Sequence, residues 1–395
     1  MILHSKRIYM EDGCKAGYLE IDDRKIIKYY PEEDNIKADI DYGNDRILPG
    51  IFDTHNHGGF GYCLMEKTNK ENVKKFLKQE ASVGVVNMLA TTAGLENIAL
   101  LSEEVGLDQD GTRILGVHSE GPWGNRVGEK GVDTGHPSID FEYARQMVEA
   151  GNGKLSLVAL APELENGIEV VKYFVSNGIN VAICHTNSNY KEANDAIDAG
   201  VSVATHLGNV MTGLHHRDIG TLGACLLRDE VDCEMICDGM HISLPMIQIY
   251  LKVKDHDQLM MISDNVSFAG LPAGRYVGWE SEGDRAFINV TEEGFVLSDT
   301  GRISGSSQPV LFGIYNLVEK LGVSMEECCK FFCYNPIRKY SDPNKKGSLK
   351  EGKDADFIVI SDDYKCLATY SEGRKVFDID FDKVECNKNF LSRMV

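Results

Sequence analysis

Basic residues are scarce in this chain, and their scarcity excludes several classes of partner. Its 395 residues include 41 lysines and arginines against 61 aspartates and glutamates, which gives a formal net charge of -20 at pH 7. A protein that binds nucleic acid or lies on an anionic membrane needs a basic surface, so we expect neither partner. An anionic substrate would need a local cationic pocket within this acidic field.

Long apolar runs and regularly spaced cysteines are also missing. No apolar run approaches the roughly 18 residues that a membrane-spanning helix needs, and residues 1–11 lack the pattern of a signal peptide. The eleven cysteines include no Cys-x-x-Cys pair, and their one cluster (Cys328, Cys329, Cys333) lacks the spacing of a zinc site. These features predict a cytoplasmic protein whose cysteines are free thiols.

After Pro49-Gly50 the chain alternates apolar runs of strand length with amphipathic stretches of helical period. The apolar runs are residues 85–90, 114–117, 155–161, 181–183, 203–204 and 260–262. The amphipathic stretches include residues 72–83, 139–150, 168–177 and 190–199. Such repeated alternation indicates a parallel sheet, and at this length it predicts an α/β fold with a (β/α)8 TIM-type barrel.

Short strand-like segments occur at both ends of the chain. Residues 3–9, 17–21 and 25–29 are joined by turns, and from about Gly347 the sequence turns strand-like again. We therefore expect a small β-sandwich domain made of residues 1–48 and 343–395, beside a catalytic barrel of residues 49–342.

Histidines and one glutamate follow the predicted barrel strands. His55 and His57 stand at i and i+2 on the first strand, so both side chains project to the same side and can reach one ion. His185 and His206 each follow a short apolar run directly, and a buried carboxylate such as Glu120 is costly unless it is paired or binds a metal. One such histidine alone is typical of a buried core residue, but together these side chains predict a site for Zn²⁺ or Fe²⁺.

Asp264 follows the last apolar run, where a carboxylate can face a metal-activated water. In that position it would act as general base and then as general acid. The alternative is a purely structural role, in which the aspartate caps the loop that follows. A third reading, the Ser-Asp-Asn motif of β-lactamases, is excluded because the chain has no Lys-Thr-Gly.

In this order, the motifs resemble those of the amidohydrolase superfamily, and specifically of the N-acetylglucosamine-6-phosphate deacetylases. The resemblance covers nearly the whole chain. It rests on Pro49-Gly50-x-x-Asp53, His118-x-Glu120-Gly121-Pro122, Thr205-His206-x-x-Asn209-x-Met211, Asp238-Gly239-Met240-His241, Ser263-Asp264 and Ser304-Gly305-Ser306-Ser307. It implies a metal-dependent hydrolase that releases acetate and glucosamine 6-phosphate from N-acetylglucosamine 6-phosphate.

The resemblance also implies roles for the metal ligands. The family's main metal site corresponds to Glu120, His185 and His206. His55 and His57 match members that can hold a second ion, so one or two divalent ions per subunit are expected. Zinc is the leading candidate, and Fe²⁺, Mn²⁺ or Co²⁺ suit the same donors. Asp264 matches the catalytic aspartate of the family.

Substrate contacts follow from the same resemblance. Asn209, Arg217 and His241 match positions that contact the sugar phosphate and hydroxyls, and a homodimer is implied because the phosphate pocket of relatives lies near a dimer interface. Arginine suits a phosphate because its planar guanidinium group can donate hydrogen bonds to two phosphate oxygens at once. Relatives carry a carbonyl-polarising histidine after a Lys-Gly pair, and here either Asp133 or His136 would take its place.

Two differences leave the substrate open. Gly208 and Val210 stand where relatives usually have an aromatic residue and an alanine, so N-acetylgalactosamine 6-phosphate or another N-acyl amide are alternative substrates.

Cyclic amidases bridge two metals with a carbamylated lysine at the end of the fourth strand, and residues 155–161 contain no lysine. A non-catalytic sugar-phosphate sensor is a further alternative, but a sensor has no need of Asp264.

Overall fold

A parallel barrel forms the middle of the protein, whose computed structural model describes residues 1–66, 68–125, 138–278 and 286–395. Its strands are β6 (Ile51–Asn56), β9 (Val85–Thr92), β10 (Arg113–Glu120), β11 (Leu155–Leu160), β12 (Asn180–Ile183), β13 (Val201–Ala204), β14 (Asp232–Ile236) and β15 (Leu259–Ile262), paired in this order. The first and last strands meet, because the Asp264 N–H donates to the His55 carbonyl at 2.9 Å. The predicted (β/α)8 barrel is confirmed.

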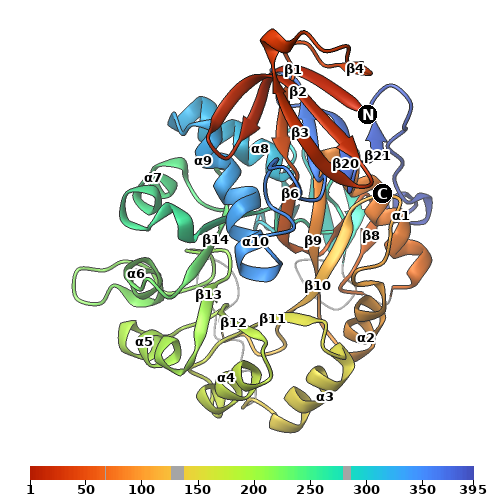
Figure 1. The fold of residues 1–395 in the computed structure, drawn as a ribbon. Helices are drawn as coiled ribbons and strands as arrows, with labels where there is room; N and C mark the ends of the chain where they lie inside the picture. The colour runs from red at the N-terminus through yellow and green to blue at the C-terminus, as the bar shows by residue number, and fades with distance from the viewer. Residues whose placement is uncertain (67, 126–137, 279–285) are drawn as a thin grey trace.

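Helices surround these strands (Figure 1). They are α1 (Lys70–Glu80), α2 (Leu95–Glu104), α3 (Phe141–Gly151), α4 (Gly167–Ser176), α5 (Tyr190–Ala199), α6 (Gly220–Leu227), α7 (Leu244–Val253) and α8 (Val310–Tyr315). Local sequence sets their ends: Asn189 and Glu192 form a capping box that starts α5. Within the described residues, no helix combines the length and apolar character needed to cross a bilayer.

One barrel strand, β14, is absent from the predicted apolar runs. Its sequence is Asp-Cys-Glu-Met-Ile, and all five residues are buried. Asp232 and Glu234 interrupt the apolar pattern, which is why hydropathy alone does not reveal the strand. The buried Glu234 instead points to a polar function inside the barrel.

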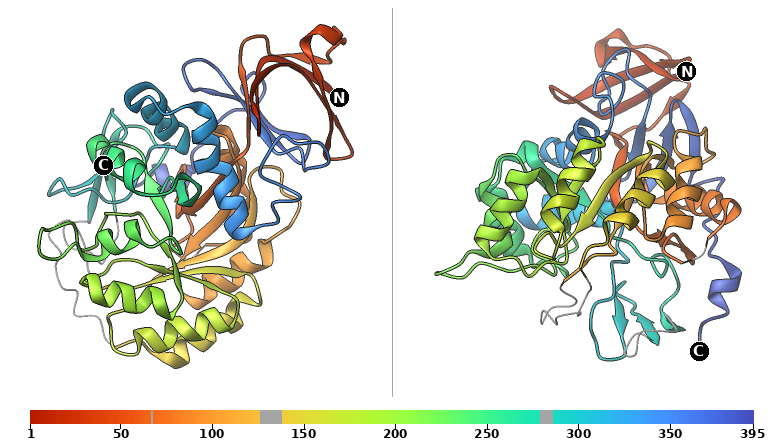
Figure 2. Two further views of the ribbon diagram at one scale, coloured as in Figure 1. Left: turned by 60° about the vertical axis from the view of Figure 1, so that its left-hand side comes forward. Right: turned by 90° about the horizontal axis from the view of Figure 1, so that it is seen from below.

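A second sheet joins the two ends of the chain, as predicted. It contains β1 (Ile2–Met10), β2 (Gly13–Asp22), β3 (Lys25–Pro31), β4 (Ile40–Asp41), β5 (Arg46–Pro49), β19 (Phe357–Ile360), β20 (Cys366–Ser371) and β21 (Arg374–Asp378). β5 lies between β1 and β19, with Pro49 opposite Phe357 in an antiparallel register. The sheet curls around its own apolar core, which includes Leu3, Leu19 and Phe357 (Figure 2).

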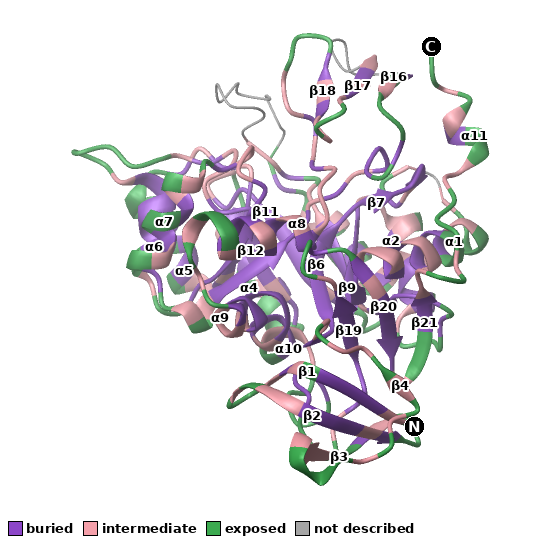
Figure 3. Ribbon diagram, turned by 90° about the horizontal axis from the view of Figure 1, so that it is seen from above, coloured by how far each residue is buried: buried purple, intermediate pink, exposed green. Residues whose placement is uncertain are grey.

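A third, small sheet follows the last barrel strand and was not predicted. β16 (Gly274–Val277), β17 (Phe287–Val290) and β18 (Val296–Ser298) are antiparallel. They share a core with α11 (Lys388–Leu391), in which Phe390 packs against Phe268 with ring centroids 5.1 Å apart. This sheet and the terminal sheet lie at opposite ends of the barrel (Figure 3).

Further helical segments follow α8 and pack against the last part of the barrel. They are η5 (Asn316–Lys320), α9 (Met325–Cys329), η6 (Lys330–Tyr334) and α10 (Asn335–Tyr340). Asn335 fixes this region to the barrel, because its side-chain amide donates to the Leu259 carbonyl at 2.8 Å, where β15 begins.

Candidate active site

Glu120 lies at the centre of a polar cluster at the carboxyl ends of the barrel strands. Its Oε1 lies 3.3 Å from His185 Nε2 and 3.0 Å from His206 Nε2. Its Oε2 lies 3.0 Å from His57 Nε2 and 3.5 Å from His55 Nε2. The structure thus brings all five proposed metal ligands together, with one carboxylate oxygen facing each pair of histidines.

The barrel strands place these side chains. His55 belongs to β6, whereas His185 and His206 come within two residues of the ends of β12 and β13. Both of the latter have a left-handed backbone, with φ of 45° and 34°. A non-glycine residue is held in this sparsely populated region only when its surroundings enforce it, which is common at functional sites.

Asp264 faces the same cluster from the end of β15. Its Oδ1 lies 3.4 Å from His55 Nε2 and 3.3 Å from His57 Nε2. The backbone of Asp264 is also left-handed, with φ of 52°. Its N–H donates to the His55 carbonyl and its carbonyl accepts from the Ser306 N–H at 3.0 Å, so the residue is held from both sides.

Mutual charges keep the carboxylates ionised despite burial. Burial raises the pKa of the Glu120 carboxyl, but the facing histidines outweigh burial and hold this pKa well below its usual range. In the same way, His55 and His57 lower the pKa of Asp264 to about 2 against the effect of burial. Burial lowers the pKa of His55, while Asp264 and Glu120 raise it well above the ordinary value.

The donor set fits a divalent metal ion. Ligand atoms of Glu120, Cys184, His185 and His206 lie within 4.8 Å of one another, and so do those of His55, His57 and Glu120. Imidazole nitrogens and carboxylate oxygens are ordinary ligands of Zn²⁺ and related ions. A cation can replace the protons that the carboxylates attract to the histidines.

Three further buried residues belong to this region without having been assigned a role from the sequence. Cys184 Sγ lies 3.4 Å from Glu120 Oε1, and its position directly before His185 was the available signal. Glu234 Oε2 lies 3.7 Å from His55 Nδ1, while its other oxygen accepts from Thr54 Oγ1 at 2.6 Å. The ring of His118 is 4.6 Å from that of His55, and burial holds the pKa of His118 well below its ordinary value.

The proposed substrate residues occupy different settings. The Asn209 side-chain amide nitrogen is buried and has no hydrogen-bond partner among the described residues. His241 Nδ1 lies 2.7 Å from Asp238 Oδ2, which fixes its ring. Arg217 is exposed on the loop before α6, which extends away from the barrel (Figure 3), whereas the metal ligands are buried. Asp133 and His136 lie outside the described residues.

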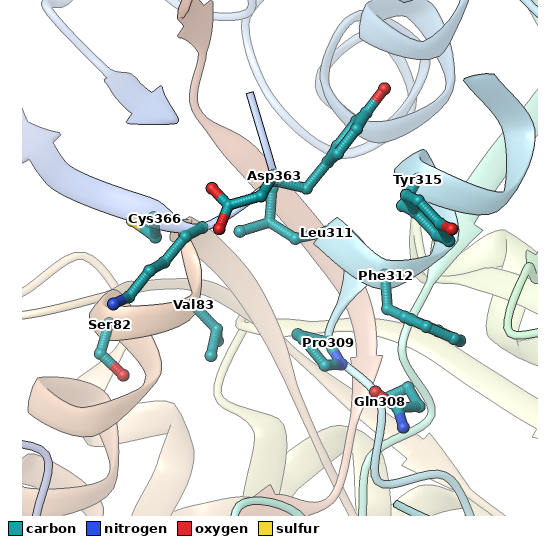
Figure 4. A pocket seen from close by; sticks show the side chains of 11 residues that line it. Ser82, Val83, Gln308, Pro309, Leu311, Phe312, Tyr315, Asp363 and Cys366 are labelled. Atoms are coloured by element: carbon teal, nitrogen blue, oxygen red, sulfur yellow. The ribbon is translucent and has the colours of Figure 1, made fainter. Parts of the chain in front are cut away.

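A separate cavity of about 450 Å³ lies between η2 (Ala81–Val83), the start of α8 and the turn before β20. Leu311, Phe312 and Tyr315 line it together with Tyr364 (Figure 4). It shares no residue with the cluster around Glu120, so it is not part of the candidate active site.

Comparison with known proteins agrees with this geometry. The sequence profile of the amidohydrolase family matches residues 46–390. The N-acetylglucosamine-6-phosphate deacetylase of Vibrio furnissii is 30% identical over 350 residues, which cover 86% of this chain and 85% of that protein. The N-acetylgalactosamine-6-phosphate deacetylase of Escherichia coli O157:H7 is 28% identical over 372 residues, which cover 91% of this chain and 94% of that protein.

Solved structures agree as well. The crystal structure of N-acetyl-D-glucosamine-6-phosphate deacetylase from Mycobacterium smegmatis superimposes with a TM-score of 0.85 at 25% identity. The match covers 95% of this chain and 100% of that one. A family profile that spans most of the sequence, together with relatives similar over most of their length, shows that the chain belongs to the amidohydrolase family.

Proposed function

We propose that this protein hydrolyses the acetamide of N-acetylglucosamine 6-phosphate to acetate and glucosamine 6-phosphate. The observation that carries the proposal is the position of the Asp264 carboxylate, which faces His55 and His57 beside Glu120. The names of the relatives support the choice of an amino-sugar phosphate as the substrate.

The roles of the residues follow from their positions. Glu120, His185 and His206 would hold a divalent metal, and His55 and His57 would hold the second ion where two bind. The bound metal would supply Lewis acidity toward water and the acetamide oxygen. Asp264 is ionised, so it can accept a proton from the attacking water as the new C–O bond forms. It then returns this proton to the sugar nitrogen as the C–N bond breaks, which yields acetate and the free amine.

Substrate binding is assigned to residues at the mouth of the barrel. We propose that Asn209 and His241 contact the sugar and that Arg217 binds the phosphate with two parallel hydrogen bonds. The exposed loop of Arg217 favours a homodimer in which a neighbouring subunit helps to enclose the phosphate. In this proposal the place of the relatives' carbonyl-polarising histidine is taken either by His136, whose ring can donate to the acetyl oxygen, or by Asp133.

Several finer assignments are part of the same proposal. We propose zinc as the metal, with one or two ions per subunit, although Fe²⁺, Mn²⁺ and Co²⁺ suit the same donors. We assign the protein to the cytoplasm on the basis of its free cysteines. The catalytic barrel would comprise residues 49–342, and the separate core of the terminal sheet supports an accessory domain of residues 1–48 and 343–395.

The test is acetate release from three substrates with zinc supplied: N-acetylglucosamine 6-phosphate, its galacto epimer and unphosphorylated N-acetylglucosamine. We expect rapid turnover of the gluco phosphate and much slower turnover without phosphate. Faster turnover of the galacto epimer would favour the second candidate, which the Escherichia coli relative supports. No release from any of the three would contradict the proposal and leave a sugar-phosphate sensor as the alternative.

A further inference from the structure

A cysteine thiol lies inside the metal cluster, and the proposed reaction gives it no role. Cys184 follows β12 directly and is 1% exposed. Its Sγ lies 3.4 Å from Glu120 Oε1 and 3.6 Å from His206 Nε2. The thiol therefore faces the same Glu120 oxygen as His185 and His206.

The spacing of these atoms is that of ligands around a single ion. A tetrahedral zinc has bonds of about 2.0–2.2 Å to nitrogen or oxygen and about 2.3 Å to sulfur, so its ligand atoms lie about 3.3–3.6 Å apart. In this cluster Glu120 Oε1 lies 3.3 Å from His185 Nε2, 3.0 Å from His206 Nε2 and 3.4 Å from Cys184 Sγ. All four ligand atoms lie within 4.8 Å of one another.

We propose that Cys184 is a metal ligand and completes a site of four protein ligands with Glu120, His185 and His206. The thiol releases its proton to solvent as the metal binds, since the thiolate is the ligand form of cysteine. A thiolate is a soft donor, so it selects Zn²⁺ or Cd²⁺ over harder ions such as Mn²⁺.

This assignment limits where water can reach the metal, and that consequence rests on the proposed function. Zinc bound by four protein ligands is typical of structural sites, whereas catalytic sites keep an open position. His55 and His57 both face Glu120 Oε2, and Asp264 Oδ1 also lies beside both of them. Zinc can expand to a fifth ligand, so an ion bound by Cys184 would still supply Lewis acidity, and the activated water is placed on the side of His55 and His57.

The first test is the spectrum of the cobalt-substituted protein, which needs no substrate. We expect an intense near-ultraviolet band from thiolate-to-cobalt charge transfer as the first equivalent of Co²⁺ is added. The Cys184→Ser variant should lose this band and bind Cd²⁺ at least about tenfold more weakly, as expected when a supporting interaction of a metal site is removed. The matched control is Cys237→Ser, because Cys237 is also buried directly after a barrel strand but lies outside the cluster.

A band that persists unchanged in Cys184→Ser, or its absence from the wild-type protein, would overturn the proposal. If the variant fails to fold, X-ray absorption of the wild-type zinc protein decides the question. We expect one sulfur neighbour at about 2.3 Å, and a shell of only nitrogen and oxygen would contradict the assignment.

A His57→Asn variant separates the two halves of the inference. It should keep the charge-transfer band while acetate release falls to background, because only the open side is disturbed. Near-normal acetate release in this variant would place the activated water on the Cys184 side instead. If the wild-type protein releases no acetate, the proposed function fails, but the spectrum still decides whether Cys184 binds metal.

Discussion

Two clusters of buried carboxylates lie at opposite ends of the barrel, and the positive charge that balances them comes from different sources. Where the terminal sheet meets the barrel, Lys346 Nζ lies 2.8 Å from Asp356 Oδ2, 2.9 Å from Asp354 Oδ2 and 3.3 Å from Glu372 Oε1. Burial lowers the pKa of Lys346, but Asp356 and Asp354 outweigh burial and raise this pKa above the ordinary value. The chain itself supplies the positive charge there.

The cluster around Glu120 has no such partner. In the described parts of the chain, neither Glu120 nor Asp264 forms an ion pair with a lysine or arginine, and their charged neighbours are histidines. A carboxylate cluster that contains a lysine keeps that positive charge permanently. A carboxylate cluster surrounded by histidines can release the histidine protons and bind a metal ion instead. This difference supports a stabilising role for the Lys346 cluster and is consistent with the chemistry proposed for the Glu120 cluster.

The largest effect should come from Asp264→Asn. The variant keeps the shape of the side chain but removes the base, so acetate release should fall about 10²–10⁴-fold. Metal content, measured by elemental analysis, should stay at the wild-type value. Near-normal turnover would rule out Asp264 as the proton carrier and would weaken the contrast between the two clusters.

Lys346→Met should destabilise the fold and spare the chemistry. Removing one partner of a buried ion pair costs about 3–5 kcal/mol, because the carboxylates stay buried without a counter-charge. The free energy of unfolding can be measured in urea, and acetate release per folded molecule should be unchanged. As a control, Lys191→Met removes an exposed pair with Asp195 and should leave the free energy of unfolding nearly unchanged. Equal losses in the two variants would contradict the role given to Lys346.

Removing the metal should have a smaller and reversible effect on stability. An ion that binds only the folded state stabilises it by about 2.7 kcal/mol at a concentration 100 times its dissociation constant. We expect wild type and Lys346→Met to gain similar amounts when zinc is returned after chelation. Glu120→Gln should gain much less, because Glu120 faces both histidine pairs. A full gain in Glu120→Gln would place the stabilising ion elsewhere.

Glu80 shows a third way to bury a carboxyl group, by keeping its proton. It is 1% exposed, and burial together with the charge of Asp53 raises its pKa from 4.5 to about 8. The folded protein then holds a proton that the unfolded chain has lost, so stability falls by about 1.4 kcal/mol for each pH unit between these values.

Glu80→Gln should remove this pH dependence, since glutamine can still accept the 3.1 Å hydrogen bond from the Asn56 amide. We expect the variant to gain stability relative to wild type as the pH rises from 5 to 8, measured by urea unfolding at each pH. A constant difference across this range would show that Glu80 is ionised in the folded protein.

Much of the barrel and the grouping of the proposed metal ligands could be predicted from the sequence, because both depend on local pattern. His55, Glu120 and His206 stand out as polar residues placed directly at the ends of apolar strands. Strand β14 could not be predicted in this way, because Glu234 interrupts its apolar pattern. The buried glutamate is explained by the neighbouring His55, and only the structure shows that the two are close. The sheet of β16–β18 was missed in the same way, because its core depends on Phe390 from the far end of the chain.

The place of β5 between β1 and β19 has a consequence for the order in which the protein is made. Pro49 is synthesised long before its partner Phe357, and at about 5–20 residues per second the delay is roughly 15–60 s. Throughout that interval one edge of β5 has no partner strand, and an unpaired edge can join the wrong chain. The nascent protein thus depends on its last strands to close an edge left open by its first, and loss of the C-terminal strands would expose that edge permanently.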